Sequence, residues 1–159
     1  MKPQKIPSAL EPIACLLKKA GWLPGRCVLL DLDLQDYPSL PPNIERIFNE
    51  FGNLKIPCLS QGIEVIPRDV EIVPMGGIFL QIAEEFGRRY GVPLFPIGMA
   101  YGSRLSLFSD STDRVFLLSE DVMWKIAESF EEALTTLLLG QKISKSMEET
   151  YDPNELQIP

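Results

Sequence analysis

The 159-residue sequence contains no histidine. Histidine is the usual general base near neutral pH and the commonest metal ligand, and a cysteine nucleophile would lack this base to activate it. The G-x-S-x-G elbow, the G-x-G-x-x-G fingerprint and the G-x-x-x-x-G-K-[ST] phosphate loop are also missing. Paired carboxylates remain as a possible catalytic chemistry, but the 22 acidic residues do not single out a pair. We therefore expect a protein that is not an enzyme and needs no cofactor.

Cysteine is scarce, and apolar runs are short. Cys15, Cys27 and Cys58 are odd in number and far apart, which fits a reducing compartment better than a disulfide framework. We interpret Cys15 as a small apolar residue on the buried side of a helix. No apolar run approaches the length of about 20 residues needed to span a membrane, and no signal peptide is visible. These features predict a soluble, cytoplasmic protein.

The sequence has fewer basic than acidic residues. Its 15 Lys and Arg and 22 Asp and Glu give a net charge of −7. Phosphate groups are bound by clustered Lys and Arg, so we expect neither nucleic acid nor a membrane as a direct partner. An acidic surface can complement a basic protein, although solubility alone also accounts for such a charge. The sequence does not indicate an oligomeric state.

Four segments carry the i, i+3, i+4, i+7 apolar spacing of an amphipathic helix. Two of them open with the S-x-x-E spacing of a capping box, at Ser8 with Glu11 and at Ser129 with Glu132. The predicted helices begin near Ser8, Pro42, Gly77 and Ser129, and they end at Gly21, Gly52, Gly91 and Gly140.

Short β-rich runs lie between these helices, at residues 54–59, 63–66, 70–73, 94–97, 104–108, 114–118 and 123–127. Pro57 would have to lie at a sheet edge or a bulge. Residues 28–37 fit either a strand or a short helix. The order of elements predicts a single α+β domain over residues 8–140, followed by a polar tail at 141–159.

The densest acidic run consists of Asp31, Asp33 and Asp36. It fits a solvated acidic face or a protein-contact patch. A metal site is a further alternative, although no glycine-centred calcium loop follows.

The segment Gly21–Arg26 combines two glycines, a proline and one of only two tryptophans. Glycine permits positive φ and proline restricts φ, so the segment predicts a sharp bend. We interpret it as a corner covered by an aromatic side chain, with a binding loop as the alternative. Trp22 is then expected to pack over the core beside the first helix, and Arg26 to pair with a carboxylate or a backbone carbonyl.

Five ordered segments together resemble the SUKH superfamily of bacterial immunity proteins, in its third subfamily. They are Ala20–Arg26, Phe48–Leu54, Pro96–Gly98, Asp113–Phe116 and Phe130–Gly140. The similarity runs from about Ser8 to Gly140. This sequence departs from the family pattern at Asn53 and Asp113, where glycine is usual, and at Met99, where glutamate is common.

The resemblance implies a cytoplasmic protein that binds and neutralises a cognate polymorphic toxin, often a nuclease. It also implies a curved, mainly antiparallel sheet of about six strands flanked by about four helices. The motif residues are expected to be structural: Gly21, Trp22, Pro24, Gly25, Arg26, Phe51, Gly52, Pro96 and Gly98.

For the toxin-binding surface, we hypothesise a contribution from Asp31, Asp33 and Asp36, with Tyr37 as an aromatic anchor. Two alternatives to an immunity protein remain open from the sequence. One is a non-catalytic regulatory or interaction module of the same fold, and the other is a small enzyme that uses paired carboxylates.

Overall fold

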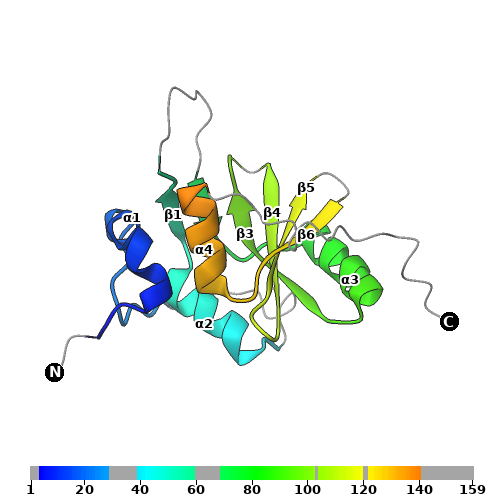
Figure 1. Cartoon of the computed structure of the whole chain (residues 1–159). Coiled ribbons are helices and arrows are strands. Elements are labelled where there is room, and N and C mark those ends of the chain that lie inside the picture. Colours follow the sequence, from blue (N-terminus) through cyan, green and yellow to red (C-terminus); the bar gives the residue numbers. More distant parts are fainter. Residues whose placement is uncertain (1–3, 29–38, 60–68, 103, 120–121, 141–159) are drawn as a thin grey trace.

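A computed structural model describes residues 4–28, 39–59, 69–102, 104–119 and 122–140 (Figure 1). The helical elements in this part are a 3-10 helix η1 (Ser8–Ile13), α1 (Ala14–Lys19), α2 (Pro42–Phe51), α3 (Ile78–Tyr90) and α4 (Phe130–Leu139). The strands are β1 (Leu54–Pro57), β2 (Asp69–Ile72), β3 (Leu94–Ala100), β4 (Leu105–Asp110), β5 (Val115–Ser119) and β6 (Val122–Ala127).

The six strands form one antiparallel sheet whose spatial order, β1 to β6, is the order of the sequence. The predicted α+β class and the antiparallel sheet implied by the family resemblance are both confirmed. Pro57 ends β1, which is an edge strand, so its missing N–H removes no hydrogen bond from the sheet interior. The register shifts between Pro96 and Gly98 and again between Val115 and Phe116.

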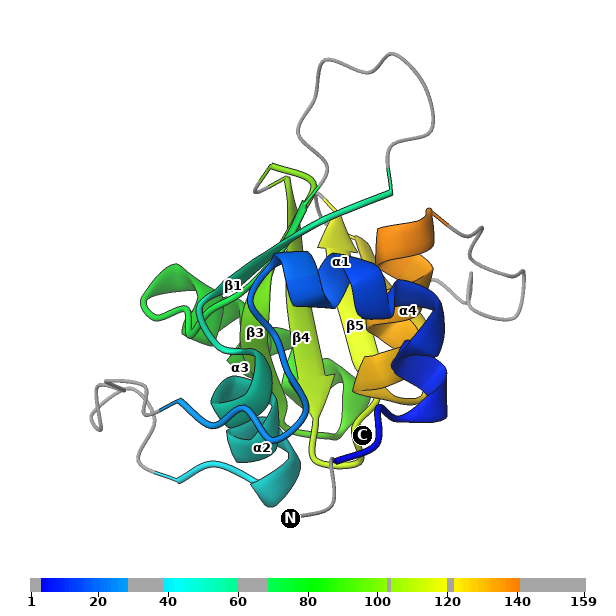
Figure 2. The ribbon, with the colours of Figure 1, turned by 90° about the vertical axis from the view of Figure 1, so that its left-hand side faces the viewer.

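Helices cover both faces of the sheet, with α1, α2 and α4 on one side and α3 on the other (Figure 2). Strand β5 illustrates the alternation that produces two cores, because successive side chains of a strand point to opposite faces. Val115 and Leu117 join the larger core under α1, α2 and α4, whereas Phe116 and Leu118 join the smaller core under α3. The larger core is therefore the one that brings the N-terminal and C-terminal helices together.

The first helix differs from its prediction at its start. It opens as η1 after Pro7, and no side chain caps it, so the capping box predicted at Ser8 is wrong. Pro12 lies inside η1 and supplies no N–H, which disfavours a regular α-helical first segment. The N-cap predicted at Ser129 is confirmed, since its Oγ accepts a hydrogen bond from Glu132 N at 3.2 Å.

Cys15 is exposed, so its interpretation as a buried apolar residue is wrong. Ile13 and Leu17 are buried and lie two positions before and after it. Residues two apart on a helix face different directions, and Cys15 therefore faces solvent.

α2 ends at Phe51 with Gly52 as its cap, as predicted. Gly52 has φ −56° and is not left-handed, and the positive φ falls on Asn53 at 62°. Asp113, in the turn between β4 and β5, has φ 75°. Asn and Asp are among the non-glycine residues that best tolerate this region. Two of the three departures from the family pattern, Asn53 and Asp113, therefore lie at positions whose positive φ favours glycine.

Several predicted features lie outside the described residues. They are the run at 63–66, the strand or helix expected at 28–37, and the polar tail at 141–159.

Gly98 lies in β3 opposite Ile72 of β2, at a close approach of the two strands. A Cβ atom built at this position would overlap the carbonyl oxygen of Glu71 and lie 3.1 Å from Ile72 Cα. Both neighbours belong to the backbone of β2, so they cannot rotate away as a side chain would. Only glycine permits this spacing of the two strands.

Gly98→Ala is therefore expected to lower the free energy of unfolding by about 1–3 kcal/mol, the usual cost of overpacking. Urea titration followed by circular dichroism measures this change. Met99→Ala, one position along the same strand but half-buried, serves as the control for a general effect of substitution in β3. Equal stability of Gly98→Ala and the wild type would contradict the close approach of the two backbones.

Candidate interaction site

The segment Gly21–Arg26 ends α1 and then reverses direction. Gly21 has φ 100°, and the Trp22 N–H donates to Leu17 O at 2.9 Å while the Gly21 N–H donates to Lys18 O at 3.1 Å. These two bonds form the Schellman arrangement that closes a helix C-terminus. The predicted left-handed cap at Gly21 is thus confirmed.

A second turn follows directly. The Arg26 N–H donates to Leu23 O at 3.0 Å, with Pro24 at the second position and Gly25, φ 83°, at the third. Proline followed by a glycine with positive φ is the residue pattern of a type II turn. The loop is therefore held by backbone hydrogen bonds at both its ends.

Trp22 anchors this loop to the larger core. It is 4% exposed, and its ring stacks on Phe51 of α2 with centroids 5.7 Å apart and planes within 7°. Phe51 in turn meets the ring of Phe130, at the start of α4, edge-on at 4.9 Å. The predicted packing of Trp22 over the core is confirmed, and the aromatic contacts join the loop, α2 and α4.

Arg26 anchors the other end of the loop. Its Nη1 donates to Glu50 O at 2.9 Å and its Nη2 to Gly52 O at 3.0 Å. Carbonyls at the end of a helix lack intrahelical partners and carry partial negative charge, so a guanidinium there satisfies them. The predicted pairing of Arg26 with a backbone carbonyl is confirmed. Desolvation lowers the pKa of Arg26, which nevertheless remains charged.

One turn earlier on α2, Arg46 is the centre of an ionic group that we call the Arg46 cluster. Its carboxylates are Glu131 of α4 at 2.7 Å, Glu50 of α2 at 3.7 Å and Asp113 of the β4–β5 turn at 3.7 Å. Three carboxylates thus surround one guanidinium, leaving an excess of two negative charges. Their side chains are between 17% and 36% exposed, so solvent reaches the cluster.

Asp113 connects the cluster to the backbone of α4. Its Oδ2 accepts a hydrogen bond from the Phe130 N–H at 3.2 Å, at the positive end of that helix. The turn that presents Asp113 is organised by buried Asp110, whose Oδ1 accepts from the N–H groups of Thr112 and Arg114 and whose Oδ2 accepts from Arg114 Nε at 2.6 Å.

Burial has the largest effect on the pKa values of the cluster's carboxyl groups. Burial raises the pKa of Glu50, and the neighbouring Glu131 adds to the rise while Arg46 opposes it. Burial likewise raises the pKa of Asp113. Burial alone would lower the pKa of Arg46, but Glu131 first, then Glu50 and Asp113, outweigh it and raise that pKa. Desolvation of the two carboxyl groups therefore outweighs their attraction to the single guanidinium.

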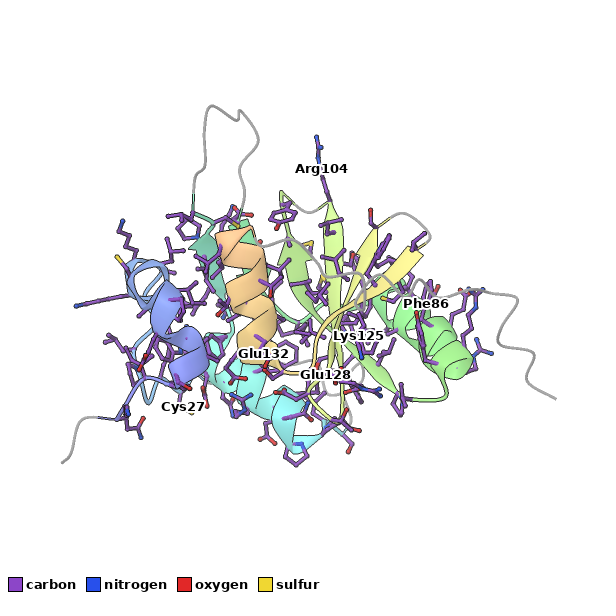
Figure 3. All side chains as sticks on the ribbon, in the orientation of Figure 1. Cys27, Phe86, Arg104, Lys125, Glu128 and Glu132 are labelled. Atoms are coloured by element: carbon purple, nitrogen blue, oxygen red, sulfur yellow. The ribbon has the colours of Figure 1, made fainter. Side chains whose placement is uncertain are left out.

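A groove of about 520 Å³ lies between the Gly21–Arg26 segment, α2 and residues 4–7 at the N-terminal side of η1. Trp22 lines the groove, and its fully buried indole Nε1 has no hydrogen-bond partner among the described residues. Figure 3 shows Cys27 at this end of the molecule and Phe86 at the opposite end, on α3. The groove is lined by Gln4, Lys5, Pro7, Trp22, Pro24, Gly25, Arg26, Cys27, Pro42, Glu45, Arg46, Asn49 and Glu50.

Four of the five family-like segments therefore meet around α2. The remaining one, Pro96–Gly98, lies in β3 at the register shift. The proposed toxin contacts Asp31, Asp33, Asp36 and Tyr37 lie outside the described residues. Sequence reasoning missed the Arg46 cluster, for which the i, i+4 spacing of Arg46 and Glu50 is the available signal.

The segments that meet around α2 also lie in the region that is similar to a known protein family. Residues 10–140 match the family described as SUKH-3 immunity protein. The chain belongs to this family. The match begins within η1 and runs through α4, so it includes the Gly21–Arg26 segment, α2 and the Arg46 cluster. Neither the curated proteins nor the solved structures contain a match to the chain.

Two further observations concern this SUKH-3 protein. In the part of the chain that the structure describes, no helix has both the length and the apolar character to cross a membrane. The same residues contain no group of three or more Cys, Asp or Glu side chains arranged to hold a metal ion.

The pairing of Arg26 with two carbonyls predicts that Arg26→Lys destabilises the fold. An ammonium group cannot reproduce the planar fork that reaches Glu50 O and Gly52 O together. We expect a loss of about 1 kcal/mol in the free energy of unfolding, measured by urea titration. Arg88→Lys, on the exposed surface of α3, is the control and should stay within about 0.5 kcal/mol of the wild type. Equal losses in both variants would contradict the capping role.

The raised pKa values predict a pH dependence. A carboxyl with a raised folded-state pKa binds its proton more tightly when folded, so its contribution to stability falls as the pH rises. The pH range over which this contribution is lost begins at the ordinary pKa values, 4.5 for Glu50 and 3.8 for Asp113, and extends above them. Glu50→Gln removes one of these groups and should gain stability relative to the wild type between acidic and neutral pH.

Urea titrations across this pH range measure the difference, with Glu84→Gln as the control for removing a surface carboxylate. If the Glu50→Gln variant instead loses stability relative to the wild type as the pH rises, the attraction of Glu50 to Arg46 outweighs the cost of burying its charge, which contradicts the prediction.

Proposed function

We propose that this SUKH-3 protein is an immunity protein that binds a cognate bacterial polymorphic toxin and neutralises it by forming a complex. The observation that carries the proposal is the family match over residues 10–140, which covers most of the chain. Neutralisation by binding requires a complementary surface and no catalytic group, in keeping with a sequence that lacks histidine. The site of action that we propose is the cytoplasm.

A nuclease toxin is the class that the charge of the chain supports. Nucleases bind polyanions through basic surfaces, and this protein carries a net charge of −7. Opposite charges accelerate the encounter of two proteins and favour the correct partner over others. Asp31, Asp33, Asp36 and Tyr37 remain our proposed contributors to this attraction.

Co-expression tests the proposal directly. The protein is produced together with the toxin domain encoded by the adjacent gene, and growth is compared with cells that receive the toxin domain and an unrelated acidic protein. We expect rescue only with the immunity protein, and a complex of the two proteins on size-exclusion chromatography. No rescue and no complex with any adjacent gene product would overturn the proposal.

A titration in vitro distinguishes binding from catalytic inactivation of the toxin. Toxin activity is measured at increasing amounts of the immunity protein. Inhibition by binding should rise in proportion to the added protein, whereas a small enzyme would inactivate an excess of toxin over time. Complete inhibition at catalytic amounts would contradict the binding mechanism.

A further inference from the structure

Leu23 differs from every other residue of the Gly21–Arg26 segment. Gly21 closes α1, Trp22 packs in the core, Pro24 and Gly25 form the turn, and Arg26 binds the end of α2. Leu23, by contrast, is 58% exposed. Isolated exposed apolar residues are common on protein surfaces, so exposure alone carries no meaning. The other five residues of the segment each stabilise the fold, as a helix cap, a core residue, part of the turn or a hydrogen-bond donor, whereas Leu23 does none of these.

These roles make the loop a rigid support. The residue before Leu23 is 4% exposed and stacked on Phe51, and the turn that begins at Leu23 ends at Arg26, which is bonded to two carbonyls. A side chain held on a preorganised turn loses little conformational entropy when a partner covers it. The loop is thus suited to presenting one apolar side chain to another molecule.

The groove adjoins the same turn, since Pro24, Gly25 and Arg26 line it. Glu45 is exposed on its α2 side, next to the Arg46 cluster with its excess of negative charge. Three cations line the groove. Arg26 is bonded to carbonyls and Arg46 is paired with the carboxylates of its cluster, whereas Lys5 is exposed on the N-terminal side. The α2 side of the groove therefore favours a positively charged group of a partner.

We propose that Leu23 and the adjoining groove form a contact surface for the toxin. In this complex Leu23 is covered by an apolar pocket of the toxin, and a basic side chain of the toxin pairs with Glu45 on the α2 side of the groove. An apolar anchor bordered by charged groups is the usual organisation of a protein interface. The proposal rests on the proposed function and specifies which surface performs it.

Binding of purified variants to the catalytically inactivated toxin domain of the adjacent gene tests the surface. Leu23→Ala should raise the Kd at least about tenfold, and Glu45→Gln about two- to fivefold with a weaker dependence on salt. Ile78→Ala and Glu84→Gln are the matched controls, because Ile78 is 64% exposed and both residues lie on α3, on the opposite face of the sheet. Both controls should bind like the wild type.

A second measurement does not depend on substituting the contact residues. Cys27 is exposed and lines the groove, so bound toxin should slow its alkylation at least about tenfold. A cysteine introduced by Ile78→Cys should react equally fast with and without toxin. Unprotected Cys27 together with wild-type binding by Leu23→Ala would overturn this surface while leaving the proposed function intact. Failure of the wild-type protein itself to bind would instead overturn the proposed function and this surface with it.

Discussion

The stacked contact between Trp22 and Phe51 holds together parts of the chain that are far apart in sequence. It fixes the loop after α1 against the last turn of α2, and the edge-on contact of Phe51 with Phe130 extends the connection to the start of α4. Around these rings, the ends of α2 and α4 are satisfied by polar groups from other segments, Arg26 for the first and Asp113 for the second. The Arg46 cluster and the groove depend on this arrangement, because their residues are supplied by the same elements.

Much of the fold could be predicted from local pattern. The helix predicted between Pro42 and Gly52 is present as α2 with an apolar face that is buried, and the runs predicted at 104–108 and 114–118 form the paired strands β4 and β5. The failures also have local causes. Pro12 lies inside η1, which opens as a 3-10 helix without the side-chain cap predicted at Ser8. Periodicity identifies the face of an element well, but it does not determine the conformation of its terminal residues.

The candidate site was less predictable, because it is built by contacts between distant segments. Arg46 meets Glu131 across 85 positions of sequence, and no local pattern connects them. The role of Arg26 could be anticipated only as a choice between carboxylate and carbonyl, since the partner depends on where α2 ends. The exposure of Leu23 beside the buried Trp22 depends on how the loop is anchored, which only the assembled structure shows.

The sheet is made entirely of neighbours in the sequence, so each strand can pair with the one synthesised immediately before it. Short-range pairing of this kind lowers the loop-closure cost of folding and permits early assembly during synthesis. The helices, by contrast, contact each other across long stretches of sequence. The Thr135 hydroxyl of α4 donates to Ala9 O of η1 at 2.7 Å, and the two residues are 126 positions apart. The sheet can thus begin to form while the ribosome is still translating, whereas η1 is covered by α4 only after α4 has emerged. The groove beside Trp22, which needs Phe130 behind Phe51, would then be completed among the last features of the newly made protein.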